Sequence, residues 1–307
     1  MTRPGPRVSV VIPVWDSPYV DTLPDAVESV RRQDPDVPVV VVDNASTQPL
    51  PHLDRVTVLR TATRVSEGSA RNLGLDHVET EYVVFLDADD LLIDGSLAYL
   101  EREIERDPET AVCATSMIEG RTDERHRAPR RLAYPLSRLR RCFALANAVW
   151  SLYPSQGSAI LRTAQVRAAG GYANSDVSED WALRGPLAFR GRIALRDRPA
   201  LVYRRHLSRR PPEARSSGEL AGAARRVLDR LRADPAVPRW AKALLPAVAL
   251  AQLTMIYGVR PIRRRLRFLV SPRPSPREDR ARQLEEHPHG PPDIGQPEPE
   301  RAASRQS

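Results

Sequence analysis

The chain has 307 residues, of which 41% are hydrophobic, so it can bury a substantial core in one large domain or two small ones. Its formal charge of +8 comes almost entirely from arginine, and aromatic residues make up only 5%. A nucleic-acid groove interleaves basic and aromatic side chains, so this composition excludes nucleic acid as the expected partner. Cys113 and Cys142 have neither metal-binding nor redox spacing, which fits a reducing compartment.

The first 120 residues alternate short apolar runs with amphipathic segments. Runs typical of buried strands cover 8–14, 37–42, 56–59, 82–86 and 111–117. Helices are expected between them, over 24–33, 66–78 and 94–106. This alternation predicts an α/β fold with a doubly wound, mostly parallel central sheet. The first apolar run is too short for a signal peptide, and a cytoplasmic protein is expected.

The pattern is less regular after residue 117. The arginine-rich range 121–141 lacks hydrophobic periodicity and is predicted to be a mobile surface segment, either a lid or an acceptor-side loop. Further predicted strands cover 157–161, 193–195 and 201–203, and further predicted helices cover 163–169, a stretch opened by Ser178 as N-cap, 213–232 and 240–259. From residue 271 proline and charge dominate, so 271–307 is expected to be disordered.

The apolar segment 240–259 is followed by an arginine cluster at 260–267. Pro246, Lys242 and Gln252 make it a poor transmembrane helix at about the minimum length of ~20 residues. Two interpretations remain open. The region 240–267 contacts an anionic membrane surface peripherally, or the helix packs on the domain and its arginines are solvated.

The stretch from Tyr82 to Asp90 reads Y-V-V-F-L-D-A-D-D. A buried strand here would place Asp87, Asp89 and Asp90 at its C-terminal end, where open α/β sheets bind their ligands. Clustered carboxylates suit Mg²⁺ or Mn²⁺ shared with substrate phosphates. The alternative is a solvated acidic turn that caps the following helix, with Asp90 as the cap.

Taken in order, these pieces resemble the nucleotide-sugar-dependent glycosyltransferases of family 2, which have the GT-A fold. The resemblance covers about residues 7–210 and rests on six motifs: V-S-V-V-I-P-V at 8–14, V-V-V-D-N-A-S at 40–46, G-S-A-R-N-L-G at 68–74, F-L-D-A-D-D at 85–90, S-E-D-W at 178–181 and Y-R-R-H at 203–206. It implies a GT-A domain over 1–210, with a Rossmann-like nucleotide-sugar-binding half at 7–118 and an acceptor half at 119–210. A C-terminal helical extension over 211–270 and the tail at 271–307 would follow.

The resemblance further implies a metal-dependent, inverting transfer of a sugar from a nucleotide diphosphate sugar to an acceptor hydroxyl. Residues that match the family's donor-binding positions are Pro13, Val14, Asp43, Arg71 and Asp87. Asp87 and Asp89 match the D-x-D motif, in which the second carboxylate ligates Mn²⁺ or Mg²⁺ directly. His206 matches a histidine that often completes the metal shell in GT-A enzymes.

The resemblance makes Asp180, the second acid of S-E-D-W, the catalytic base, and Glu179 its rival or an orienting group. Plainer interpretations stay open, since Asp43 can be a turn former, Arg71 a surface arginine and His206 structural. The chain departs from the family at Trp15-Asp16, where an aromatic–Asn pair is frequent, and at Asn44, where a second Asp is frequent. These departures leave the identity of the nucleotide base open.

The acceptor class is not fixed by these motifs: a cell-surface polysaccharide, a lipid-linked glycan and a small natural product all fit. Two other functions are weighed against glycosyl transfer. A sugar nucleotidyltransferase shares this sheet but needs a glycine-rich, basic loop after the first strand, where the chain has V-W-D-S-P at 14–18. A catalytically inactive nucleotide-sugar-binding relative would keep the fold without the chemistry.

Overall fold

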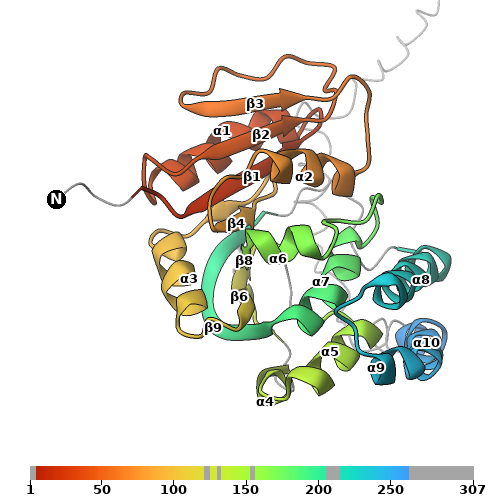
Figure 1. Cartoon of the computed structure of the whole chain (residues 1–307). Helices are drawn as coiled ribbons and strands as arrows, with labels where there is room; N and C mark the ends of the chain where they lie inside the picture. The colour runs from red at the N-terminus through yellow and green to blue at the C-terminus, as the bar shows by residue number, and fades with distance from the viewer. Residues whose placement is uncertain (1–4, 121–124, 130–132, 153–155, 205–214, 263–307) are drawn as a thin grey trace, which may run out of the picture. The chain divides into compact units, whose positions relative to one another are not determined.

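The computed structural model describes residues 5–120, 125–129, 133–152, 156–204 and 215–262 (Figure 1). Met1–Val259 form one compact unit, and Arg260–Ser307 form a second, of which only 260–262 are described. The predicted metal ligand His206 and the predicted disordered tail at 271–307 lie outside the described residues. The predicted domain boundaries at 118 and 210 stay predictions.

The described strands form one nine-stranded sheet. They are β1 (Val8–Val14), β2 (Val39–Asp43), β3 (Val56–Arg60), β4 (Tyr82–Phe85), β5 (Leu91–Leu92), β6 (Thr110–Glu119), β7 (Arg125–Arg127), β8 (Ala159–Arg162) and β9 (Arg192–Tyr203). Their order is β3-β2-β1-β4-β8-β6-β9-β5, with β7 paired to β6. The first four strands are parallel and pair in the order β3-β2-β1-β4, which brings the carboxyl ends of β1, β2 and β4 to one edge.

Helices cover both faces of this sheet (Figure 1). They are α1 (Tyr19–Arg31), α2 (Glu67–Asp76), α3 (Ser96–Glu105), α4 (Ala133–Ser137), α5 (Arg140–Val149), α6 (Thr163–Ala168), α7 (Glu179–Arg190), α8 (Ser217–Ala233), α9 (Arg239–Ala243) and α10 (Leu245–Leu253), and a π-helical stretch, Thr254–Val259, continues α10.

The core is divided by the sheet into two layers. Successive side chains of a strand point to opposite faces, so Val10 and Ile12 of β1 pack with α1 and α3, whereas Val11 packs with α2. Helices α7, α8 and α10 extend the second layer, and Val227 of α8 is fully buried in it. The C-terminal helices therefore complete the core that supports α7.

Several elements differ from the sequence-based expectations, among them the helix expected over 240–259, which is divided into α9, α10 and a π-helical stretch. Helix α1 was expected to start at Pro24, but it begins at Tyr19 and contains Pro24. The buried side chains of Val20 and Leu23 extend its apolar face toward the N-terminus. Strand β9 is one strand instead of two, because β6 and β9 stay paired through register shifts. In the described part of 121–141 the chain forms β7, α4 and the start of α5.

Candidate active site

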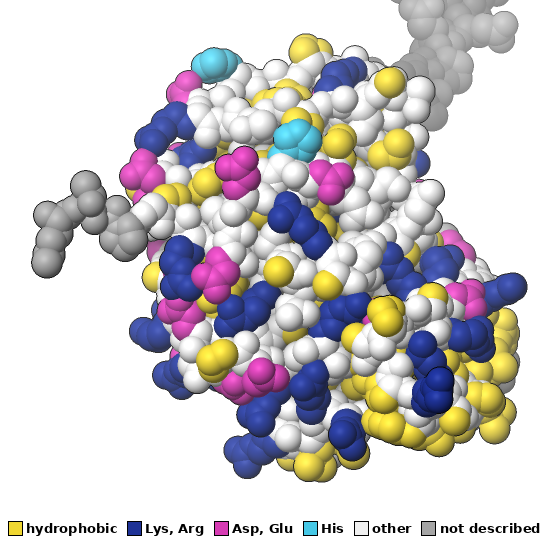
Figure 2. Space-filling model, in the orientation of Figure 1, with side chains coloured by type: hydrophobic (Ala, Val, Ile, Leu, Met, Phe, Trp, Pro, Cys, Tyr) yellow, Lys and Arg dark blue, Asp and Glu magenta, His cyan; other side chains and the backbone are white. Residues whose placement is uncertain are grey.

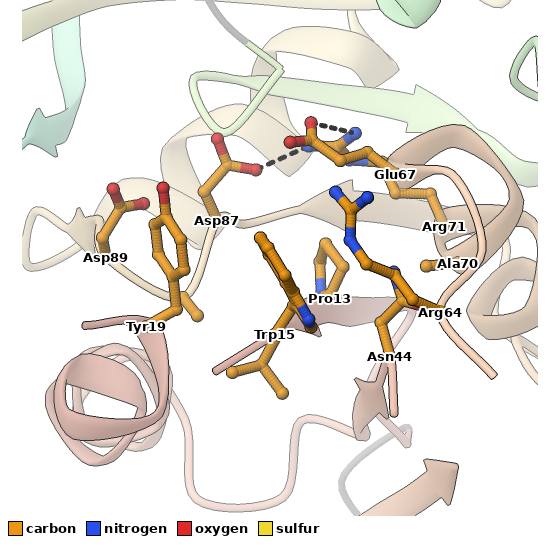
Figure 3. A pocket seen from close by; sticks show the side chains of 12 residues that line it. Pro13, Trp15, Tyr19, Asn44, Arg64, Glu67, Ala70, Arg71, Asp87 and Asp89 are labelled. Atoms are coloured by element: carbon orange, nitrogen blue, oxygen red, sulfur yellow. Dashed lines mark hydrogen bonds and ion pairs between the residues drawn. The ribbon is translucent and has the colours of Figure 1, made fainter. Parts of the chain in front are cut away.

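An open cavity lies at the carboxyl ends of β1 and β4 (Figure 3). It is lined by Pro13, Val14, Trp15, Tyr19, Asn44, Arg64, Glu67, Ala70, Arg71, Asp87, Ala88 and Asp89. Because the strands are parallel, residues that follow β1, β2 and β4 in sequence reach the same edge of the sheet. The fold thus brings together most of the donor-site residues predicted from sequence, although Asp43 is not among the lining residues.

The three aspartates after β4 form a compact cluster. One carboxylate oxygen from each of Asp87, Asp89 and Asp90 lies within 4.8 Å of the others. Asp89 and Asp90 are buried, and helix α3 begins instead after Gly95. The alternative of a solvated acidic turn with Asp90 as the helix cap is therefore wrong. Three hard oxygen donors at this spacing fit a divalent cation such as Mg²⁺ or Mn²⁺.

The end of β9 is fastened to this aspartate cluster. The backbone N–H of Arg204 donates to Asp90 Oδ1 at 3.1 Å, and the Arg204 Nε donates to the backbone carbonyl of Asp89. A second guanidinium nitrogen of Arg204 lies 2.8 Å from Asp25 Oδ2 in α1. The chain is thus held against the cluster two residues before His206.

Arg71 is the central cation of the site. It is 4% exposed, and its two Nη atoms donate to Asp87 Oδ1 and Glu179 Oε1, both at 2.7 Å. Burial by itself lowers the pKa of Arg71, but Asp87, Glu179 and then Glu67 raise it well above its ordinary value. Arg71 is therefore a buried, charged bridge between the loop after β4 and α7, and the interpretation as a surface arginine is wrong.

The two acids that open α7 have different surroundings. Glu179 is buried against Arg71, and burial raises the pKa of its carboxyl to about 7 against the opposing effect of Arg71. Asp180 keeps a 25% exposed side chain and lies 2.7 Å from Arg184 Nη2. Ser178 is the N-cap residue, as predicted, but its side chain caps no helical N–H and instead accepts from Arg215 at 2.9 Å.

A line of contacts joins α2 to the turn before α7, and we call residues 66–72 and 171–179 together the α2 seam. Asn72 makes two bonds to the backbone of Tyr172: its Oδ1 accepts from the N–H at 2.7 Å and its Nδ2 donates to the carbonyl at 3.0 Å. The hydroxyls of Ser66 and Ser69 both donate to Asn174 Oδ1. These contacts fix the position of α7 relative to the cavity.

Gly68 lies at the closest approach within the α2 seam. A Cβ at this position would overlap the backbone carbonyl of Ala173, so the helix can dock here only without a side chain. The motif G-S-A-R-N at 68–72 is thus a docking surface for the turn that carries S-E-D-W. Sequence reasoning singled out Arg71 but missed Gly68 and Asn72.

Asp43 and Asn44, at the end of β2, make structural contacts. Asp43 is buried, its Oδ1 accepts from the N–H of Ser46 at 2.9 Å, and its other oxygen pairs with Arg60. Asn44 binds both backbone groups of Val65, each at 2.8 Å. Asn44 therefore holds the segment that leads into α2, and Arg60 was not anticipated from the sequence.

The outer wall of the cavity is an aromatic ring with a guanidinium over it. Trp15 is 39% exposed, and the Cζ of Arg64 lies 4.0 Å from the centroid of its ring (Figure 3). The neighbouring Asp16 accepts from the backbone N–H and the hydroxyl of Thr47, at 2.6 and 2.7 Å. At the position where Trp15-Asp16 departs from the family pattern, Trp15 thus presents a flat ring to the cavity, and the carboxylate of Asp16 holds the turn at residues 44–47 in place.

Comparison with protein families gives one match, to the model described as Glycosyl transferase family 2, over residues 9–160, about half of the chain. The matched range includes β1, β2, α2 and the aspartate cluster, and it ends before α7. No curated protein sequence matches the chain.

Solved structures similar to the chain are glycosyltransferases. TarS 1–349 of S. aureus in complex with UDP is 19% identical, with a TM-score of 0.60 over 82% of this chain and 72% of that one. The same protein in complex with UDP-GlcNAc is 17% identical, with a TM-score of 0.58 over 82% and 73%. The mannosyltransferase PcManGT of Pyrobaculum calidifontis, in complex with GDP-Man and Mn²⁺, is 20% identical, with a TM-score of 0.56 over 93% and 81%. The likeness confirms the predicted GT-A fold.

Proposed function

Since this chain belongs to glycosyl transferase family 2, we propose that it moves a sugar from a nucleotide diphosphate sugar to an acceptor hydroxyl, with a divalent cation as cofactor and inversion at the anomeric carbon. The observation that carries the proposal is the bridge made by Arg71, which joins Asp87 of the aspartate cluster to Glu179 of α7 beside one open cavity. Donor binding and acceptor activation need groups from both sides of such a cavity.

The proposed donor site uses the cavity wall after β1 and α2. Pro13, Val14 and the ring of Trp15 provide a flat apolar surface for a nucleoside, and Arg71 provides positive charge for a diphosphate. Asp43, next to the lining residue Asn44, is proposed as a nucleoside ligand, with one of its oxygens paired to Arg60. The UDP, UDP-GlcNAc and GDP-Man complexes of the similar structures support a donor of this class.

The proposed metal ligands are Asp89, Asp87 and His206, with Asp90 adjoining them. A bound Mn²⁺ or Mg²⁺ would stabilise the negative charge that grows on the diphosphate as the sugar departs. Asp87 also accepts from Arg71, so the same carboxylate would orient a guanidinium proposed to bind the diphosphate. Arg204, at the end of β9, holds the Asp89–Asp90 turn in place.

Asp180 is proposed as the catalytic base. Its partly exposed carboxylate can accept the proton of an acceptor hydroxyl while the hydroxyl oxygen attacks from the face opposite the diphosphate. Arg184, 2.7 Å away, orients it. Glu179 is buried against Arg71 and is therefore proposed as a positioning residue rather than the base. The acceptor is proposed to be a glycan, a lipid-linked glycan or a small molecule on the cytoplasmic side.

A panel of nucleotide sugars, assayed for Mn²⁺-dependent release of nucleoside diphosphate, tests this proposal. We expect wild type to turn over one donor, Asp89→Ala to lose activity, and Asp180→Asn to lose about 10²- to 10⁴-fold in rate while it still binds the donor by calorimetry. Asp54→Asn, at an exposed aspartate outside the cavity, is the matched control and should retain wild-type turnover.

Three outcomes would contradict the proposal. Turnover by Asp89→Ala equal to wild type would remove the metal role of the aspartate cluster. Formation of a nucleotide sugar from nucleoside triphosphate and sugar phosphate, without transfer to an acceptor, would assign the chain to the sugar nucleotidyltransferases. Donor binding without any turnover would identify an inactive relative.

A further inference from the structure

The helix at the C-terminal end of the compact unit has one buried and one exposed apolar face. Leu245, Val248 and Ile256 are buried in the core layer formed with α5 and α8. Gln252 lies on the same face, and its Nε2 donates to the carbonyl of Ala148 in α5 at 2.9 Å. These contacts anchor α10 to the domain along one side.

Among the described residues, large apolar side chains of α9, α10 and the adjoining turn and π-helical stretch remain exposed. We call this set, Trp240, Leu244, Leu250, Leu253 and Tyr257, the apolar stripe; each member is at least 39% exposed, and Leu250 reaches 67%. Apolar side chains gather over α10 on the face shown in Figure 2. A contiguous exposed apolar surface of this kind marks an interaction site rather than ordinary surface variation.

The charge around the apolar stripe selects an anionic partner. Residues 235–259 contain two basic residues, Arg239 and Lys242, and no acidic one. Both lie within two positions of Trp240 in sequence, and the arginine-rich range 260–267 follows in the sequence. An apolar surface beside cationic groups, and with Trp and Tyr among its members, has the composition of a helix in the headgroup region of a membrane.

A cavity beside Trp240 strengthens this assignment. It has a volume of about 220 Å³ and is lined by Arg140, Arg141, Ala188, Phe189, Ala236, Pro238 and Trp240. The guanidinium carbon of Arg141 lies 5.7 Å from the centroid of the Trp240 ring. Arginine binds phosphate through charge-assisted hydrogen bonds, so this cavity offers a place for a lipid phosphate at the edge of the apolar stripe.

We propose that the apolar stripe lies on an anionic lipid bilayer, with its leucines in the headgroup and acyl boundary and the cationic groups of Arg239, Lys242 and Arg141 on lipid phosphates. Residues 245–262 are long and apolar enough to span a membrane by length and composition. Spanning would, however, expose Gln252 and detach Leu245, Val248 and Ile256 from the core, whereas surface binding leaves them in place. Pairing two copies through this face would bring two basic regions together.

Flotation with lipid vesicles tests the proposal on the full-length chain. Wild type should float with vesicles of phosphatidylcholine and phosphatidylglycerol, should not float with phosphatidylcholine alone, and should be released by high salt. The double variant Leu250→Glu/Leu253→Glu should bind the anionic vesicles at least about tenfold more weakly, because two apolar anchors are lost and two negative charges are added.

The control is Val58→Glu, which places one such charge on an exposed valine of β3 far from the stripe in sequence. It should float like wild type. Hydrolysis of a soluble nucleotide sugar should be unchanged in the double variant, so a failure of membrane binding is distinguishable from a failure of the proposed enzymatic function. Wild type that does not float with anionic vesicles, or a dimer in solution that the double variant dissociates, would overturn the proposal.

Discussion

Replacement of Glu179 by glutamine should make the stability of the protein less sensitive to pH. Burial raises the pKa of Glu179 from an ordinary 4.5 to about 7, although Arg71 opposes the effect. One pKa unit corresponds to about 1.4 kcal/mol, so ionised Glu179 should oppose folding by about 3 kcal/mol. Glutamine has nearly the same shape and no ionisable proton, so Glu179→Gln isolates this contribution.

The direction of the effect follows from the protons bound by each state. Below pH 4.5 residue 179 is protonated in both the folded and the unfolded chain and has no pH-dependent effect. Between pH 4.5 and about 7 the unfolded chain releases this proton and the folded chain keeps it, so stability falls as pH rises. Above pH 7 the full effect persists.

Urea unfolding of metal-free protein at pH 5 and pH 8 measures this contribution. The free energy of unfolding of Glu179→Gln, relative to wild type, should increase by about 2 to 3 kcal/mol between the two pH values. Glu28→Gln, at an exposed glutamate of α1, is the matched control and should show no such increase. A difference between Glu179→Gln and wild type that is the same at both pH values would refute the reasoning, because Glu179 would then ionise as it does in the unfolded chain.

Two further predictions concern the α2 seam. Arg71→Met leaves two carboxylates without their shared cation and should lower the free energy of unfolding by about 3 to 5 kcal/mol in urea; stability equal to wild type would show that the bridge is not formed. Gly68→Ala should lower stability by about 1 to 3 kcal/mol and reduce turnover, because its Cβ overlaps the carbonyl of Ala173. In the matched variant Gly218→Ala, the nearest atom to the new Cβ is 3.9 Å away, so a melting temperature equal to or above that of wild type is expected. Equal melting temperatures of Gly68→Ala and Gly218→Ala would contradict the packing argument.

The sequence was sufficient for β1, β2 and β4, because a strand buried on both faces requires an uninterrupted apolar run. The runs at 8–14 and 82–86 correspond to β1 and β4 to within one residue. The start of α1 was misjudged because Pro24 resembles an N-terminal proline, whereas the apolar spacing of Val20 and Leu23 carries the helix further back. Strand β9 was divided because an exposed polar stretch interrupts its apolar pattern but not its pairing with β6.

The site was predictable only where it follows a local pattern. Three aspartates after an apolar strand are visible in one stretch of sequence, and their compact arrangement agrees with the metal cluster expected there. The bonds between Asn72 and Tyr172 join residues one hundred positions apart and leave no periodic signal. The stacking of Arg64 on Trp15 also cannot be predicted from the sequence, since it depends on a loop position that only the folded chain defines.

The α2 seam also limits how this protein can be recombined with its relatives. A chimaera that joins residues 1–118 of this chain to a later segment from another family member would have to supply a glutamate for Arg71, a backbone that fits Asn72, and a turn that tolerates Gly68. An exchange that carries α2 together with α7 keeps these partners matched. Hybrids that exchange α7 without α2 should therefore be less stable than hybrids that exchange both helices.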